Sequence, residues 1–409
     1  MGWTETRVVD NRMRFVMLAR TREQAFAQLC REFGVSRRIG YKWLARYEAE
    51  GPVGLLDRSR APHEHPHAVH AAIAERCVAL RNAHPTWGPV KVRAWLQRNH
   101  PEVTWPAASS IGDLFDRQGL TVKRRLRRRS APSSRPFSAC AQPNDVWCID
   151  FKGWFLTGDG TRCEPLTLSD AYSRYLLRCH PVARIDADHV WPILSAAFRE
   201  FGLPTALRSD NGPPFASRGA GGLSKLAVKV IKAGVLPERI APGKPQENGR
   251  HERFHLTLLQ DTASPPAHSL RQQCERFRRF KRLYNEERPH EALNNNTPIE
   301  HYAPSSRHWD GVLHEPQYDD DQEVRRVRNT GAVKWRGKLI YISEALVGEP
   351  VGLSECADGS YHVSFGPVLL GVITHRDDRL RRPKKQTCGR VDNADALPTS
   401  PQENQQQKT

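Results

Sequence analysis

Residues 144–260 alternate short apolar runs with helical patterns, and acidic side chains lie close to where several of these segments end. Residues 146–151 form a run typical of a strand, with Asp150 near its end. A second apolar run at residues 206–208 leads directly into Ser-Asp-Asn-Gly, which contains Asp210. A loop rich in Pro and Gly then enters a helical pattern over residues 247–260, which carries Glu252. This alternation predicts an α/β layer with antiparallel strands first.

The remaining segments of this layer show the same two periodicities. We expect neighbouring strands at 166–169 and 175–180, joined by a turn at 170–174, with Asp170 as a turn residue. Trp147 and Phe151 are expected in the core, and Asp145 at the entry to a strand. The other expected elements are a helix at 187–201, a basic helix at 223–232 and an extended segment at 237–240. Another basic helix is expected within 267–293, ending at Arg288-Pro289-His290.

Three of the carboxylates in this layer have the spacing of a metal cage. Asp150 and Asp210 follow strand patterns and Glu252 lies on a helix, far apart in sequence. Mg²⁺ takes hard oxygen ligands and keeps several waters, so a few carboxylates suffice and substrate phosphate supplies the rest. Glu247 is the rival third acid, although a Glu at a helix start is also explained by the helix dipole. Glu252 lies more than a turn inside the expected helix and is preferred.

The net charge favours a polyanionic partner. The chain carries 62 Lys and Arg against 45 Asp and Glu, a net charge of +17, and residues 1–135 hold 25 basic but only 12 acidic side chains. Such a surplus favours nucleic acid, because neutralised phosphates release counterions. No apolar run approaches the ~20 residues of a membrane span. The nine dispersed cysteines form no Cys-x-x-Cys pair, which predicts a reducing cytoplasm.

Residues 14–60 show the pattern of a helix-turn-helix. Thr21 with Gln24 fits a capping box, a turn follows at Gly34, and Ser36 is placed to cap a second helix. That helix directs Trp43, Leu44 and Tyr47 inward. Its outward side chains, expected to contact DNA, are Arg37, Arg38, Tyr41 and Lys42. The alternative is an ordinary helical hairpin with a solvated basic face.

Residues 69–122 are expected to form a second helical, winged-helix-like DNA-binding domain. Helices are predicted at 71–81 and 90–97, and a third is predicted to be capped by Thr104 and to begin at Trp105. Its buried stripe is Ile111, Leu114 and Phe115, and Ser109 and Ser110 are candidate DNA contacts. A basic linker follows at 123–140. Its candidate phosphate contacts are Lys123, Arg124, Arg125, Arg127, Arg128 and Arg129, unless the run is merely solvated.

The last third of the chain shows a strand pattern. Residues 322–380 are expected to form a small β-barrel with strands at 333–335, 339–342, 351–353, 361–365 and 369–374. The tail at 389–409 is polar and expected to be disordered. The fold class that follows is multidomain α+β, with helix-turn-helix units, an α/β core and a C-terminal barrel.

Four segments together carry a resemblance to a known family. They are Val-Trp-Cys-Ile-Asp-Phe ending at Phe151, Ser-Asp-Asn-Gly at 209–212, Asn-Gly-Arg-His-Glu-Arg-Phe at 248–254, and Tyr-Asn-Glu-Glu-Arg-Pro-His-Glu-Ala-Leu at 284–293 with Thr-Pro after it. In this order they resemble the DDE transposases of bacterial insertion sequences, whose core is similar to the retroviral integrase core. The N-terminal helical units and the expected barrel also look like that group.

The resemblance implies an RNase H-like catalytic core at 141–305, with Asp150, Asp210 and Glu252 as the catalytic and metal-binding triad. It implies two Mg²⁺ ions, for which Mn²⁺ substitutes. The zinc domain of retroviral type is absent, so no zinc site is transferred. Separately, the charges around the third acid make Lys244, Arg250, His251 and Arg253 candidate DNA contacts, unless these side chains are merely solvated.

The expected function is that of a transposase which binds the terminal repeats of its element, cleaves their 3′ ends and joins them to target DNA. Homo-oligomers on the joined ends, in a bacterial cytoplasm close to the nucleoid and without a membrane partner, are part of this expectation. Two alternatives remain open. One is a catalytically silent DNA-binding regulator derived from a transposase, and the other is a nuclease that only hydrolyses. The products distinguish them, because only a transposase makes strand-transfer joints.

Overall fold

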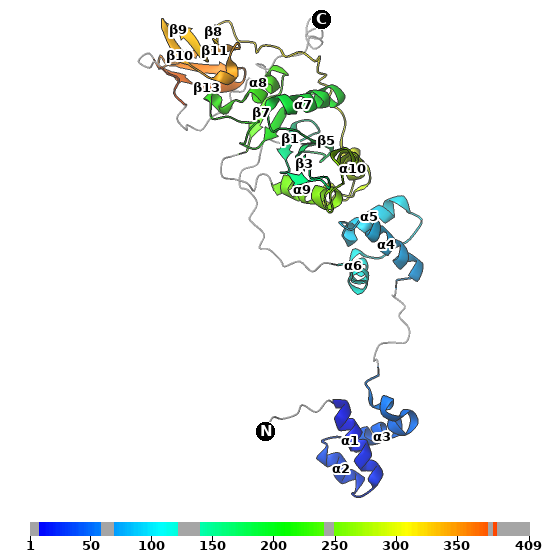
Figure 1. Ribbon diagram of the computed structural model, residues 1–409. Helices are drawn as coiled ribbons and strands as arrows, with labels where there is room; N and C mark the ends of the chain where they lie inside the picture. Colours follow the sequence, from blue (N-terminus) through cyan, green and yellow to red (C-terminus); the bar gives the residue numbers. More distant parts are fainter. Residues whose placement is uncertain (1–7, 59–68, 122–139, 241–248, 375–378, 383–409) are drawn as a thin grey trace. The chain divides into compact units, whose positions relative to one another are not determined.

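The computed structural model describes residues 8–58, 69–121, 140–240, 249–374 and 379–382, with the backbone alone at 249–252 (Figure 1). The chain forms two compact units, Met1–Ala68 and Val69–Thr409. No helix among these described residues is long and apolar enough to cross a membrane.

The first unit is a small helical domain. It contains α1 (Val8–Thr21), α2 (Phe26–Glu32), α3 (Arg37–Glu50) and the short 3₁₀ helix η1 (Gly51–Leu55). Phe15, Val16, Leu29 and Cys30 form its buried core, and Trp43, Leu44 and Tyr47 pack against it as expected. The Ser36 cap is confirmed, because its side chain accepts a hydrogen bond from the Ile39 amide.

Sequence reasoning missed α1 and therefore misplaced one cap. Thr21 is the last residue of α1, and its hydroxyl donates to the Leu18 carbonyl oxygen at 2.9 Å. It cannot also begin α2, which is preceded by Ala25 without a side-chain cap. The predicted capping box of Thr21 and Gln24 is wrong, because a hydroxyl in the last turn of a helix bonds back to its own helix.

Three helices form what we call the α4–α6 bundle (residues 69–121). They are α4 (Ala71–Ala83), α5 (Pro89–Asn99) and α6 (Ala108–Arg117). Ile111, Leu114 and Phe115 are buried as predicted, beside Trp87 and Val92. The predicted cap at Thr104 is wrong, since α6 begins at Ala108. Pro106 disfavours a helical conformation at Trp105, which is instead buried with its indole donating to the His100 carbonyl oxygen.

The α/β core (residues 140–315) is built on a five-stranded mixed sheet in the order β5-β4-β1-β6-β7. Its strands are β1 (Val146–Phe151), β4 (Pro165–Asp170), β5 (Leu176–Pro181), β6 (Ala206–Ser209) and β7 (Leu236–Arg239). β4 pairs antiparallel with both β1 and β5, whereas β6 is parallel to β1 and to β7. The expected α/β layer with antiparallel strands first is confirmed.

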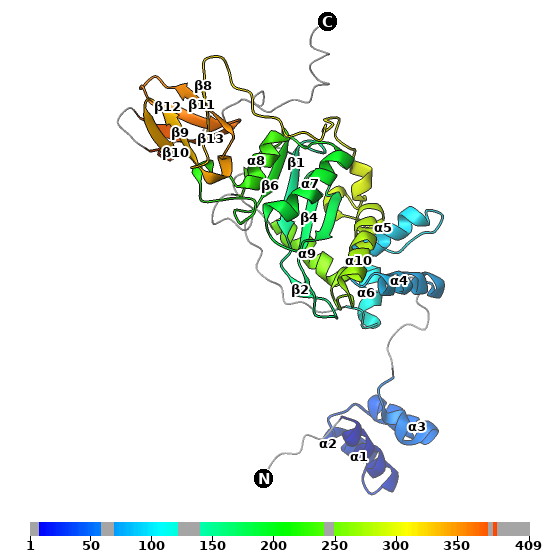
Figure 2. The same ribbon diagram turned by 45° about the horizontal axis from the view of Figure 1, so that its top comes forward.

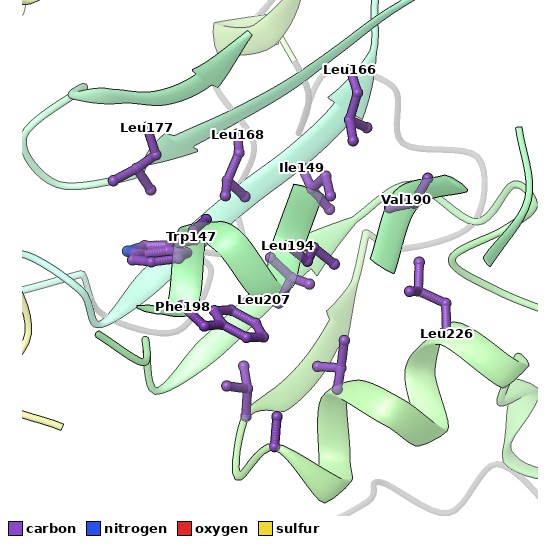
Figure 3. Close-up of a cluster of buried hydrophobic side chains, with 14 of the residues drawn as sticks. Trp147, Ile149, Leu166, Leu168, Leu177, Val190, Leu194, Phe198, Leu207 and Leu226 are labelled. Carbon is purple, nitrogen blue, oxygen red and sulfur yellow. The ribbon is translucent and has the colours of Figure 1, made fainter. Parts of the chain in front are cut away.

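Helices cover this sheet on two faces. The helices are α7 (Ala187–Phe201), α8 (Lys225–Lys232), α9 (Gly249–Thr262) and α10 (Leu270–Arg282). Figure 3 shows the main core, where Trp147 and Ile149 of β1 meet Leu194 and Phe198 of α7. Side chains of α9 and α10 form a second cluster with Leu176 of β5. Because its two faces are both covered, β1 is a nearly continuous apolar run.

Shorter elements complete the core. They are the hairpin β2 (Phe155–Leu156) and β3 (Arg162–Cys163), the 3₁₀ turns η2 (Ala220–Gly222), η5 (Glu291–Leu293) and η6 (Pro298–His301), and the π turn η4 (Leu283–Glu287). The helix expected over 267–293 begins at Leu270, and its expected end at Arg288-Pro289-His290 agrees with the structure. It passes into the π turn after Arg282 and stops before Pro289, as proline requires.

The C-terminal strands correct the predicted barrel. Their bounds are β8 (Glu323–Arg326), β9 (Ala332–Trp335), β10 (Lys338–Tyr341), β11 (Pro350–Glu355), β12 (Tyr361–Phe365) and β13 (Val368–Ile373), with the turn η7 (Glu344–Leu346) (Figure 2). They form an open four-stranded sheet, β13-β12-β11-β8, and a separate hairpin, β10-β9. The sheets do not close, because edge strand β13 instead pairs with Arg381 through Val372 and packs against Gly221.

Candidate active site

Asp150 and Asp210 lie at the same level of the sheet. β1 and β6 are adjacent and parallel, and their register pairs Val146 with Ala206. Asp150 comes four residues after Val146, and Asp210 comes four residues after Ala206. Both aspartates therefore lie where the two strands end. The carboxyl ends of parallel strands are where open α/β sheets bind ligands. Both residues are partly exposed, and the Asp150 side chain keeps 14% of its accessible surface.

His255 of α9 lies against Asp150 and was missed by sequence reasoning. Its ring Nδ1 is 3.9 Å from Asp150 Oδ2, and its Nε2 is 2.9 Å from the Thr167 hydroxyl. Thr167 in turn donates to the backbone carbonyl oxygen of Asp150 at 3.1 Å. The histidine is only 6% exposed. Its position three residues after Glu252 was the available signal, because residues i and i+3 share a helix face.

The turn after β6 is shaped around Asp210. The Gly212 amide donates to Asp210 Oδ1 at 3.1 Å, and a Cβ on Gly212 would lie 3.1 Å from Oδ2. A side chain at position 212 would therefore crowd the carboxylate. Asn211 donates from its side chain to the Ile240 carbonyl oxygen at 2.8 Å. This bond ties the Asp210 turn to the end of β7.

The remaining acids of the core divide clearly by their hydrogen bonds. Asp145 accepts from the amides of Ala141 and Gln142, as a strand-entry residue does. Asp170 is 1% exposed and accepts from the Asn144 amide and from the amide and hydroxyl of Ser173. Burial raises the pKa of the Asp170 carboxyl, and these hydrogen bonds oppose the rise. Both residues have the structural roles that the sequence predicted.

The third acid is placed by its backbone alone. Glu252 belongs to the first turns of α9, one turn before His255, and its side chain is not among those described. The rival Glu247 lies outside the described residues. Among the side chains that are described, no group of three or more His, Cys, Asp and Glu has the arrangement of a metal site. Asp150 and Asp210 nevertheless offer the hard oxygen donors that Mg²⁺ prefers.

Four of the candidate DNA contacts lie on one exposed face of α3. Arg37, Arg38, Tyr41 and Lys42 are all exposed. Tyr41 also stacks on Phe26 with ring centroids 4.2 Å apart, so its ring packs against α2 while the residue stays exposed to solvent. In α6 Ser109 is exposed and Ser110 is half-buried, and Arg253 of α9 is exposed.

Several other candidates lie outside the described side chains. The side chains of Arg250 and His251 are undescribed, like that of Glu252. Outside the described residues lie Lys244, the tail at 389–409, and the linker residues Lys123, Arg124, Arg125, Arg127, Arg128 and Arg129.

Family models match the core and the N-terminal helices. Residues 141–245 and 233–298 each match a model described as an integrase core domain. Residues 11–63 match a helix-turn-helix domain, and residues 39–115 match a homeodomain-like domain. The integrase-type core and the helix-turn-helix region expected from the sequence are thereby confirmed.

Solved integrase structures are similar at a low level. A chain of the simian T-cell lymphotropic virus intasome in complex with PP2A regulatory subunit B56 gamma shares 14% identity, with a TM-score of 0.36 over 77% of this chain and 100% of that chain. The HTLV-2 integrase catalytic core domain in complex with magnesium shares 13% identity, with a TM-score of 0.30 over 40% of this chain and 99% of that chain.

Curated relatives come from insertion elements. An uncharacterized 31.7 kDa protein of insertion element IS407 from Burkholderia multivorans (strain ATCC 17616 / 249) is 30% identical over 233 residues, which are 56% of this chain and 80% of that protein. An uncharacterized 39.2 kDa protein of insertion element IS476 from Xanthomonas euvesicatoria is 27% identical over 57% of this chain and 65% of that protein. The chain therefore belongs to the family of insertion-sequence transposases that carry helix-turn-helix domains and an integrase core domain.

Proposed function

We propose that this chain is a metal-dependent DDE transposase that binds the ends of its element, cleaves their 3′ ends and transfers them into target DNA. The observation that carries the proposal is the level placement of Asp150 and Asp210 at the ends of two adjacent parallel strands. Helix α9 runs beside them, because His255 lies against Asp150. Glu252, one turn earlier on the same helix face, is the third carboxylate of the proposal.

The proposed roles follow from the chemistry of the donors. Asp150, Asp210 and Glu252 would hold Mg²⁺, or Mn²⁺ in its place, and His255 with Thr167 would keep β1, β4 and α9 in contact. The metal held by these carboxylates would supply Lewis-acid chemistry, which activates the attacking oxygen and stabilises the leaving oxygen. Water attacking phosphorus nicks the element end and frees a 3′-hydroxyl. That hydroxyl then attacks target DNA, one phosphodiester replaces another, and no ATP is needed.

End binding is proposed for the N-terminal helices. The exposed α3 face of Arg37, Arg38 and Lys42 suits phosphates and base edges, and the α4–α6 bundle would contact the same DNA through Ser109 and Ser110. The basic segment from Lys123 to Arg129, together with Lys244, Arg250, His251 and Arg253, would follow the phosphate backbone towards the carboxylates. Because two element ends must be joined in one reaction, a homo-oligomer on DNA is part of the proposal.

A strand-transfer assay tests this function. Purified protein receives labelled DNA from the borders of its element with Mg²⁺, beside Asp150→Asn, Asp210→Asn and Glu252→Gln. We expect each variant to lose cleavage and joining by at least ~10³-fold while end binding persists, because carboxylates that hold the metals contribute several kcal/mol to the transition state. Asp188→Asn is the matched control, because Asp188 is a 90% exposed acid on α7.

The outcomes separate the competing functions. End binding without nicking or joining by the wild-type chain would identify the regulator instead. Nicks without joints would identify a nuclease. Joining that survives Glu252→Gln would remove Glu252 from the catalytic set and turn attention to Glu247.

A further inference from the structure

One buried arginine joins the α4–α6 bundle to the α/β core. Arg288, in the segment that follows α10, is 4% exposed. Its Nη1 lies 3.4 Å from Asp261 Oδ2 near the end of α9 and 3.2 Å from the hydroxyl of Thr86, between α4 and α5. A single guanidinium thus contacts helix α9 of the core and one turn of the bundle. We call Thr86, Asp261 and Arg288 the bundle joint.

Other contacts support the same interface. Leu283 of the π turn packs against the hydrophobic core of the bundle. At a second point, Nη2 of Arg98 in α5 lies 3.1 Å from Oε1 of Glu300. The same nitrogen donates to the Asn295 carbonyl oxygen at 3.3 Å. The interface therefore combines an apolar contact, a charged contact between buried Arg288 and the partly exposed Asp261, and a more exposed charged contact. Together these three contacts favour one docked arrangement of the bundle.

The charges of the joint depend on one another. Burial lowers the pKa of Arg288, whereas the charge of Asp261 opposes this. Burial raises the pKa of the Asp261 carboxyl, and Arg288 and the Thr86 hydroxyl counteract the rise. A buried charge that loses its partner is strongly destabilising, so these groups hold their positions jointly.

The core side of the joint is firmly attached to the sheet. Asn285, three residues before Arg288, accepts from the Leu176 amide at 2.8 Å and donates to the Leu176 carbonyl oxygen at 3.0 Å. Tyr284 is buried in the cluster between α9, α10 and β5. The Tyr-Asn-Glu-Glu-Arg segment thus fixes Arg288 relative to β5, and through Arg288 it fixes the bundle.

Helix α9 connects this joint to the candidate active site. Asp261 follows Glu252 by nine residues on the same helix, a distance of about 13 Å at 1.5 Å per residue. Between them His255 contacts Asp150. One rigid element therefore contacts the bundle near one end and carries site residues near the other.

We propose that Arg288 is a positioning residue which, through Thr86 and Asp261, sets the distance between DNA held by the α4–α6 bundle and the carboxylates of the core. The distance decides which phosphodiester reaches Asp150 and Asp210, so the joint specifies the position of the cut. This inference rests on the proposed function, in which the bundle contacts the element end. Arg288 touches no reacting atom.

The test removes the bundle side of the joint without removing a charge. Thr86→Val in the full chain replaces the hydroxyl by a methyl group of similar size, and Thr86→Ser is the matched control that keeps it. Three quantities are measured: end affinity, the position and rate of nicks on end-labelled border DNA with Mg²⁺, and hydrogen exchange of amides in residues 87–96. Arg288→Lys, which keeps the charge but not the planar fork, is a second variant.

We expect Thr86→Val to bind ends within about twofold of the wild type, to lose at least tenfold in cutting at the wild-type phosphodiester, and to nick neighbouring positions. Amide exchange in α5 should rise in Thr86→Val and stay unchanged in Thr86→Ser. Wild-type nick position and rate in both Thr86→Val and Arg288→Lys would overturn the proposal. An equal loss of binding and of all nicks would also overturn it, since that indicates a general structural defect.

Failure of the proposed function has a different signature. If the wild-type chain binds border DNA but makes no nick, the proposed function fails and the positioning role fails with it. The contact between Thr86 and Arg288 is then tested by amide hydrogen exchange alone. Faster exchange in Thr86→Val than in Thr86→Ser supports the contact, and equal exchange refutes it.

Discussion

Hydrogen bonding distinguishes the aspartates of the central sheet from one another. Asp170 is buried and accepts three hydrogen bonds, two from Ser173 of its own turn and one from the amide of Asn144 before β1. Asp150 and Asp210 occupy the ends of adjacent parallel strands and remain partly exposed. Residue type alone does not separate these roles, because all three follow or end short apolar runs. Burial and three accepted hydrogen bonds set Asp170 apart, since a carboxylate bonded in this way has fewer lone pairs for a metal.

At the residue scale, His290 should make folding sensitive to acid. Burial, with the charges of Lys91 and Arg288, lowers the pKa of His290 from 6.5 to about 3. A depressed folded-state pKa contributes stability that is present above pH 6.5 and is lost as pH falls towards 3. We expect the free energy of unfolding to fall by about 1 kcal/mol per pH unit in this window from His290 alone.

Urea unfolding at pH 7, 6 and 5 measures this slope in the wild type and in His290→Gln. The variant should show a flatter dependence on pH. His268→Gln is the control, because His268 is exposed and its loss should leave the slope as it is. An identical slope in wild type and His290→Gln would contradict the assignment.

Among the elements, the helix starts show when a local signal is sufficient. Ser36 caps α3 as predicted, whereas Thr21 and Thr104 cap nothing. Ser36 follows an open turn with Gly34 at φ +63°, so its hydroxyl is available to the first turn of α3. Thr21 already belongs to α1, and α6 begins only beyond Pro106. A capping residue therefore acts only where the preceding backbone has left the helix.

The cap on α3 should be measurable. Ser36→Ala removes the acceptor for the Ile39 amide and should destabilise the start of α3 by about 1 kcal/mol. Native-state hydrogen exchange of the first amides of α3 should then be roughly fivefold faster, because 1.4 kcal/mol corresponds to a factor of ten. Ser36→Thr keeps a hydroxyl and should exchange at nearly the wild-type rate. Unchanged exchange in Ser36→Ala would show that the cap adds no stability.

On the scale of the whole molecule, α8 is buried from two sides. Leu226 and Val230 belong to the core beneath the central sheet, whereas Val228 and Ile231 belong to the core of the C-terminal strands. Lys232 adds an ion pair with Glu349 at 2.8 Å. The C-terminal strands therefore complete the α/β core, while the first unit, Met1–Ala68, has a hydrophobic core of its own.

Removing the two ends of the chain should have opposite consequences. A chain that stops at Glu315 exposes Val228 and Ile231, and we expect it to aggregate, because contiguous apolar patches associate. Val228→Lys with Ile231→Glu should restore a monodisperse fragment.

Deleting residues 1–68 should leave a folded remainder. Size-exclusion chromatography and ANS fluorescence measure both effects, and a soluble truncated chain without the two substitutions would contradict the shared core.

The sequence by itself determined the extent of the elements whose signals lie within a few neighbouring residues. These include β1, β12, α7 and the Ser36 cap, because period, turn residues and caps act over a few residues. It also indicated that Asp150 and Asp210 follow strands. Only the tertiary structure decided that β6 lies beside β1, which brings the two aspartates level, and that His255 lies against Asp150. It also decided that β13 pairs with Arg381 rather than closing a barrel, and that Arg288 is buried against Thr86. These outcomes depend on partners distant in sequence, and periodicity within one segment carries no information about which distant segment will cover it.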